Sequence, residues 1–106
     1  MVVAVIYVTT NNIQSARKIS RTLVKERLVA CVNIIPKIES IYWWKGKIEK
    51  SKEVVLIAKT VEDNVKKSIR RIKELHKYDV PEIIALPIVG GLKDYLNYIV
   101  DETKCD

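Results

Sequence analysis

Strand-like and helix-like segments follow one another along this chain in an order that few folds accept. Residues 2–8, VVAVIYV, form a continuous apolar run rich in β-branched side chains, which is typical of a strand covered on both faces. Thr10, Asn11 and Asn12 are favourable N-cap residues, and residues 12–26 carry apolar side chains at helical spacing. The chain is therefore predicted to begin with a strand and an amphipathic helix.

The remaining segments continue this alternation around a hairpin. A strand over 28–35 is interrupted by Pro36, and extended character resumes over 38–44 before a Lys45-Gly46 turn. The later elements are a strand over 47–60, a helix over 61–76, a strand over 82–89 with Pro87 in its edge part, and a helix from Leu92 to Val100. The order β-α-β-β-α-β, then α, predicts an α+β ferredoxin-like sandwich with a long hairpin and a C-terminal helix, formed by residues 1–106 as a single domain.

The only two tryptophans, Trp43 and Trp44, lie beside the hairpin turn. Hairpin arms of this length extend beyond a small sheet, so they have no core of their own chain to cover. The sheet segments are also too apolar for one face to stay in water, which predicts association. We expect a closed ring of subunits with Ile41, Tyr42, Trp43 and Trp44 in the interface. A stacking platform for nucleic-acid bases is the alternative.

The chain is moderately basic, with 19 Lys and Arg against 13 Asp and Glu and a formal net charge of +6. This balance permits attraction to polyanions, but acidic side chains are interspersed with the basic ones, as on a solvated face. An RNA-recognition module of the same topology would carry aromatics on its central strands, and the sequence contains no phenylalanine. Nucleic acid is therefore not the favoured partner.

Signals for secretion and for catalysis are missing from the sequence. The apolar N-terminal run is too short to span a bilayer and has no basic region before it, so we expect a cytoplasmic protein without a membrane partner. Cys31 lies in an apolar run and is expected to be buried, whereas Cys105 lies in a polar tail. No GxSxG, HExxH or CxxC pattern occurs, so no enzymatic activity is predicted.

An ordered set of short motifs covers nearly the whole chain. It comprises Ala30-Cys31-Val32-Asn33, Ser40-x-Tyr42-x-Trp44-x-Gly46-Lys47, Glu53, Lys59-Thr60 and His76-x-Tyr78-x-x-Pro81-Glu82. On these residues the chain resembles the CutA divalent-cation tolerance proteins over residues 4–100. The resemblance implies a ferredoxin-like fold, a cytoplasmic homotrimer, and a role in tolerance to copper and other divalent cations. It also implies likeness to the PII proteins, which are trimers with ligand clefts between subunits.

His76 is the only histidine and falls at the end of the second predicted helix. It suits a capping or hydrogen-bonding role, or a metal site, because imidazole binds copper and zinc. One histidine cannot form a site alone, so Asp79 and Glu82 are the other candidate ligands, completed by neighbouring subunits. Some bacterial family members proposed to bind copper carry a cysteine and a second histidine where this chain has Val8 and Leu75. We therefore expect a copper site here to be weak or absent.

The other motif residues suggest a ligand cleft made of Lys59, Tyr42, Trp44, Glu53 and Tyr78. A lysine, a carboxylate and aromatic walls could hold a small anion or metabolite between subunits without any metal. A packed subunit interface of satisfied polar groups is the alternative. The sequence therefore favours a divalent-cation tolerance module, with a PII-like small-molecule sensor as the second interpretation and a nucleic-acid binder as a distant third.

Overall fold

The computed structural model describes residues 2–78 and 80–104. Its elements are β1 (Val3–Thr10), α1 (Ile13–Lys25), β2 (Cys31–Trp44), β3 (Lys47–Val61), a short 3₁₀ helix (Glu62–Asn64), α2 (Val65–Leu75), β4 (Ile83–Pro87) and α3 (Lys93–Glu102). This order confirms the predicted succession of strands and helices and the α+β class. Several boundaries differ from the prediction: β2 begins at Cys31 and not at residue 28, α2 begins four residues later than expected because a 3₁₀ turn precedes it, and β4 ends at Pro87.

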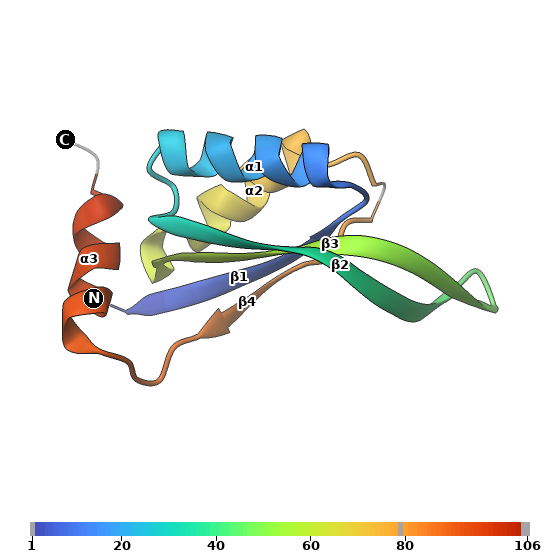
Figure 1. Cartoon of the computed structure of the whole chain (residues 1–106). Helices are drawn as coiled ribbons and strands as arrows, with labels where there is room; N and C mark the ends of the chain where they lie inside the picture. Colours follow the sequence, from blue (N-terminus) through green and yellow to red (C-terminus); the bar gives the residue numbers. More distant parts are fainter. Residues whose placement is uncertain (1, 79, 105–106) are drawn as a thin grey trace.

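The four strands form one antiparallel sheet in the order β2-β3-β1-β4. Helices α1 and α2 lie side by side on one face of this sheet, and α3 lies at its end, near the start of β1 (Figure 1). Each of the two crossover helices connects strands that have another strand between them, as expected for a ferredoxin-like arrangement. The sheet therefore has one face covered by two helices and one face that they leave open.

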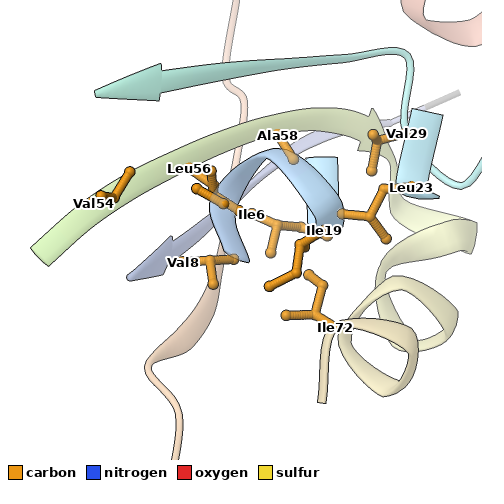
Figure 2. Packing of buried hydrophobic residues seen from close by; sticks show 10 residues of the cluster. Ile6, Val8, Ile19, Leu23, Val29, Val54, Leu56, Ala58 and Ile72 are labelled. Carbon is orange, nitrogen blue, oxygen red and sulfur yellow. The ribbon is translucent and has the colours of Figure 1, made fainter. Parts of the chain in front are cut away.

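The main core lies between the sheet and the two covering helices. Ile6 of β1, Leu56 of β3 and Ile72 of α2 are fully buried there and pack with Ile19 and Leu23 of α1 (Figure 2). Their spacing follows from alternation along the strands and from the apolar stripe of each helix. A second, smaller cluster under α3 closes the end of the sheet and consists of Val3, Ala30, Val61 and Ile99.

The edge strand β2 runs through Pro36, where the sequence predicts an interruption. Its register against β3 shifts between Ile35 and Ile38, which is a β-bulge. Proline has no N–H to donate to the ladder, and a bulge at a sheet edge accommodates that loss without ending the strand. The predicted two-residue turn is present, since Lys45 and Gly46 have φ values of 50° and 79°. As a result the hairpin is one continuous pair of arms that extends far beyond the other strands (Figure 1).

The face of the sheet opposite α1 and α2 is covered by neither helix and is mainly apolar, with Lys59 and Cys31 at one end. Because side chains alternate along a strand, the core position of Ile6 places Val5 and Tyr7 on the opposite face. Their register partners on β3 and β4 share that face. We call this surface the open face and define it as Val5, Tyr7, Ile35, Ile57, Ile84 and Leu86. Ile35, Ile84 and Leu86 are exposed to solvent in a single chain, so the expected apolar side chains are present on this face, and the association predicted from them stays a prediction.

Candidate functional site

A pocket of about 610 Å³ lies where the hairpin arms leave the body of the sheet. Side chains from three parts of the chain line it: the end of β1, both arms of the hairpin, and the segment between α2 and β4. The lining residues are Thr9, Ser40, Ile41, Tyr42, Trp44, Ser51, Glu53, Tyr78, Val80 and Glu82. Among them are two carboxylates, five hydroxyl groups and three aromatic rings. Within the described part of the chain, no lysine, arginine or histidine belongs to this lining.

The hairpin supplies the first wall through strand alternation. Ser40, Tyr42 and Trp44 are two residues apart on β2 and therefore point to one side of the arm. Ser51 faces Ser40 across the two strands, and its hydroxyl lies 3.5 Å from the Tyr42 hydroxyl. Trp43 points to the opposite side and is 72% exposed. The two adjacent tryptophans thus lie on different surfaces: Trp44 lines the pocket, and Trp43 lies on the opposite side of the arm.

The segment after α2 supplies the second wall and is fastened to the first. The Tyr78 hydroxyl donates a hydrogen bond of 3.0 Å to the Glu53 carboxylate of β3. The Thr9 hydroxyl lies 3.5 Å from the Glu82 carboxylate, and the Thr9 backbone N–H donates to the Glu82 carbonyl at 3.3 Å. These contacts join residues far apart in sequence, so the pocket exists only in the folded chain.

His76 lies directly behind this second wall. Its Nε2 is 2.6 Å from the Thr9 carbonyl oxygen, which can only accept, so Nε2 carries a proton and donates it. The backbone N–H of Tyr78 donates to Nδ1 at 3.1 Å. Both ring nitrogens are therefore engaged in the neutral imidazole, and the ring positions Tyr78 in the pocket wall. A metal ion bound at His76 would have to displace one of these two hydrogen bonds.

The Glu53 carboxylate contributes negative charge to the pocket lining. The residue is only 7% exposed, although it sits at the base of a solvent-exposed hairpin. Burial raises the pKa of its partner Tyr78 to about 12, and the hydrogen bond to Glu53 and the negative charge of that carboxylate act in the same direction. The phenol therefore stays protonated at neutral pH and remains a donor to the carboxylate.

The free energy of unfolding should fall as the pH is raised into the alkaline range, and we expect Tyr78→Phe to reduce this fall. The phenol titrates near pH ~10 in the unfolded chain and at about 12 in the folded one. Its stabilising contribution is complete below the unfolded pKa and is lost as the pH rises through the folded pKa. Because Tyr78 is partly exposed, we discount the free energy of unfolding involved to about 1–2 kcal/mol.

Urea unfolding between pH ~9 and pH ~12, at one protein concentration, measures this contribution. The difference in free energy of unfolding between the parent protein and Tyr78→Phe should shrink across that range. Tyr98→Phe is the control, because the Tyr98 hydroxyl lies against the Ala30 carbonyl and outside the pocket lining. Parallel pH profiles for the parent and Tyr78→Phe would show that this hydroxyl does not carry the effect.

The structure brings most of the predicted cleft residues together. Tyr42, Trp44, Glu53 and Tyr78 all line the pocket, together with Ile41 from the predicted interface and Glu82 from the predicted metal ligands. Asp79 lies outside the described residues. Among residues 2–78 and 80–104, no group of three or more His, Cys, Asp or Glu side chains is arranged to hold a metal ion.

Lys59 lies away from the other cleft residues. It is six residues along β3 from Glu53, a separation of about 20 Å along the strand. Its Nζ is 3.7 Å from the Cys31 sulfur, on the cross-strand neighbour in β2. Cys31 is half-buried rather than buried as predicted, because its side chain faces away from the two covering helices. The lysine therefore contributes no positive charge to the pocket lining.

Four lining residues were not among the site residues predicted from the sequence: Thr9, Ser40, Ser51 and Val80. A signal existed for two of them. Ser40 has the same strand parity as Tyr42 and Trp44, and Ser51 is its partner once the two-residue turn fixes the hairpin register. Thr9 and Val80 enter through contacts between distant segments, for which no local pattern exists.

Comparison with known proteins identifies relatives over nearly the full chain. The sequence model of the CutA1 divalent ion tolerance protein family matches residues 4–102. The chain is 47% identical over 100 residues to the divalent-cation tolerance protein CutA of Pyrococcus horikoshii, covering 94% of this chain and 97% of that protein. It is 44% identical to the chloroplastic protein CutA 1 of rice, covering 94% of this chain but only 56% of that longer protein.

The solved structures agree with this result. The divalent cation tolerance protein (Cut A1) of Thermus thermophilus superimposes with a TM-score of 0.93 at 42% identity, covering 96% of this chain and 99% of that one. In the described part of the present chain, none of the helices has the length and apolar character needed to cross a membrane. The topology and the sequence motifs thus point to one family.

Proposed function

Because the chain belongs to the CutA1 divalent ion tolerance protein family, we propose that it is a non-catalytic binding module that supports tolerance to divalent cations and uses the pocket at the base of its hairpin as its ligand site. The observation that carries the choice of site is the buried Glu53 carboxylate, held by Tyr78 in a pocket lined also by Glu82. The family is named for tolerance rather than for a catalysed reaction. A cytoplasmic location is part of the proposal, although the rice relative is named chloroplastic.

The module acts as a homotrimer in this proposal. Ile35, Ile84 and Leu86 leave an apolar sheet face exposed in the single chain, and Ile41, Trp43 and Ile48 leave the hairpin arm exposed. Contiguous apolar surfaces of this kind mark sites of protein association. The pocket opens toward the same side of the sheet, since Thr9 and Glu53 have the strand parity of the open face. A neighbouring subunit that covers the open face would therefore also border the pocket.

A dedicated copper site is not favoured by the donor atoms present. Imidazole nitrogen suits copper, and thiolate sulfur suits copper(I) in particular. Both nitrogens of His76 already have partners, and Cys31 lies near Lys59, away from the pocket. The pocket itself offers carboxylate and hydroxyl oxygens, which suit hard cations such as Mg²⁺, Ca²⁺ or Mn²⁺. In this proposal, tolerance does not depend on tight copper binding by one subunit.

A gene deletion tests the cellular role. We expect the deletion strain to grow more slowly than its parent at raised concentrations of one or more divalent cations, and the parental gene to restore growth. A gene encoding Glu53→Gln should restore growth only partly, whereas Glu39→Gln, which removes a carboxylate of the arm outside the pocket, should restore it fully. Normal growth of the deletion strain with every cation tried would refute the tolerance role.

A native mass spectrum with stoichiometric copper(II) tests the metal argument on the purified protein. We expect a trimer that gains no whole copper ions, and no difference between the parent and His76→Ala. Uptake of one copper per subunit that His76→Ala abolishes would instead restore His76 as a ligand.

A further inference from the structure

We propose that the pocket selects an organic ammonium ion, a small amine in its protonated form, rather than a bare metal ion or an anion. This inference rests on the proposed function, because it takes the pocket to be the ligand site and names the class of ligand. It replaces the small anion that the sequence suggested, since that expectation depended on Lys59 lying in the cleft.

The charge that this chain contributes to the lining disfavours an anion as the ligand. Glu53 and Glu82 are acidic, and the described lining includes no basic side chain. The Glu53 carboxylate is nearly buried, and its described partner is the neutral hydroxyl of Tyr78. A buried carboxylate without a cationic partner is costly, so a cationic ligand would gain by neutralising it. The pocket is acidic although the whole chain has a net charge of +6.

The size and walls of the pocket distinguish an organic cation from a metal ion. A bare Ca²⁺ or Mg²⁺ needs a compact shell of oxygen atoms at ~2.0–2.6 Å. The pocket has a volume of about 610 Å³, within the range of roughly 300–1,000 Å³ that small organic ligands occupy. Ile41, Trp44 and Val80 give it apolar walls that a hydrated metal ion cannot use. An alkyl chain would contact these walls while its charged end lies near the carboxylates.

The aromatic rings add a preference for positive charge. Tyr42, Trp44 and Tyr78 line the pocket, and aromatic faces attract ammonium groups within roughly 6 Å of the ring centre. The chain already shows this contact, since the Lys45 ammonium lies 5.8 Å from the centre of the Trp44 ring. The hydroxyl groups of Ser40, Ser51 and Thr9 can accept hydrogen bonds from the N–H groups of a primary amine. The carboxylates and aromatic rings thus suit the positive charge of an alkylammonium ion, and the hydroxyl groups suit its N–H groups.

Three probes of equal length and different charge test the inference: butylammonium, butanol and butyrate. Isothermal titration calorimetry on the trimer at neutral pH should show butylammonium binding at least ~10-fold more tightly than butanol, with butyrate weaker still. Glu53→Gln and Trp44→Leu should each weaken butylammonium by about 10-fold or more. The matched controls Glu39→Gln and Trp43→Leu, which alter the arm outside the pocket lining, should leave its affinity unchanged.

Any other result of these titrations would contradict one specific part of the proposal. Equal affinity for butylammonium and butanol would show that the pocket recognises apolar volume and not charge. If Mg²⁺ binds and Glu53→Gln abolishes that binding while butylammonium does not bind, the pocket stays the ligand site but the ligand class is wrong. If neither Mg²⁺ nor any butyl probe binds up to about 10 mM, and every variant keeps the parental trimer mass, the pocket itself is refuted as the ligand site. Growth of the deletion strain tests the tolerance role independently of these titrations.

Discussion

Replacing Ile84 by lysine should convert the proposed trimer into folded monomers. Ile84 lies on β4 in the open face and is 50% exposed in the single chain, so a lysine there remains hydrated in a monomer. In an assembly that covers the open face, each subunit would instead bury an unpaired ammonium group, which costs several kcal/mol. The dissociation constant should rise by at least ~100-fold. Sedimentation velocity should then show the chain mass of 12.2 kDa in place of three times that value.

Val24→Lys is the matched control for this experiment. Val24 is 43% exposed and lies on α1, on the opposite side of the sheet from the open face. Val24 is therefore exposed to a similar degree as Ile84 and receives the same substitution, but it lies outside the proposed interface. The argument fails if Ile84→Lys remains a trimer at micromolar concentration, or if Val24→Lys dissociates to the same extent. Circular dichroism and cooperative thermal unfolding confirm that both variants are folded.

The sequence predicts the fold well because the fold depends on short-range patterns. Apolar periodicity marks β1 and α1, and the N-cap bond from the Ser15 N–H to the Asn12 side chain at 2.8 Å sets where α1 begins. The Lys45-Gly46 turn fixes the register of the two long arms. Pro36 is the exception. A proline signals the loss of one ladder hydrogen bond, but whether the strand ends or forms a bulge depends on its pairing with β3, which a local pattern does not contain.

The site is predicted less completely, because its geometry depends on contacts between distant segments. Tyr78 reaches Glu53 across 25 residues, and Thr9 reaches Glu82 across 73. Residue types suggest that tyrosine, glutamate and lysine share a cleft, but strand register decides which of them do. Register places Lys59 beside Cys31 and Glu53 at the base of the arms. Four of the five predicted cleft residues therefore line one pocket of the single chain, and Lys59 does not.

Removing the hairpin arms should separate assembly from folding. The variant replaces residues 39–52 by Asn-Gly, a dipeptide that favours the two-residue turn the shortened strands require. The main core should survive, because its nearest members on β3 are Val54 and Leu56. The variant should remain folded, lose all measurable butylammonium binding together with the Tyr42 and Trp44 wall, and no longer form a stable trimer. Calorimetric titration and sedimentation velocity measure the two losses separately.

The control variant keeps the arms and changes only the turn, from Lys45-Gly46 to Asn-Gly. It retains positive φ at both turn positions and should therefore trimerise and bind as the parent does. A deletion variant that still sediments as a trimer would assign assembly to the open face alone and leave the exposed Trp43 without a structural role. Loss of the trimer in the deletion variant, with the turn variant unchanged, would mean that the arm both encloses the pocket and joins the subunits. Ligand binding and assembly would then be thermodynamically linked, because the same strands carry Trp44 toward the pocket and Trp43 toward the neighbouring subunit.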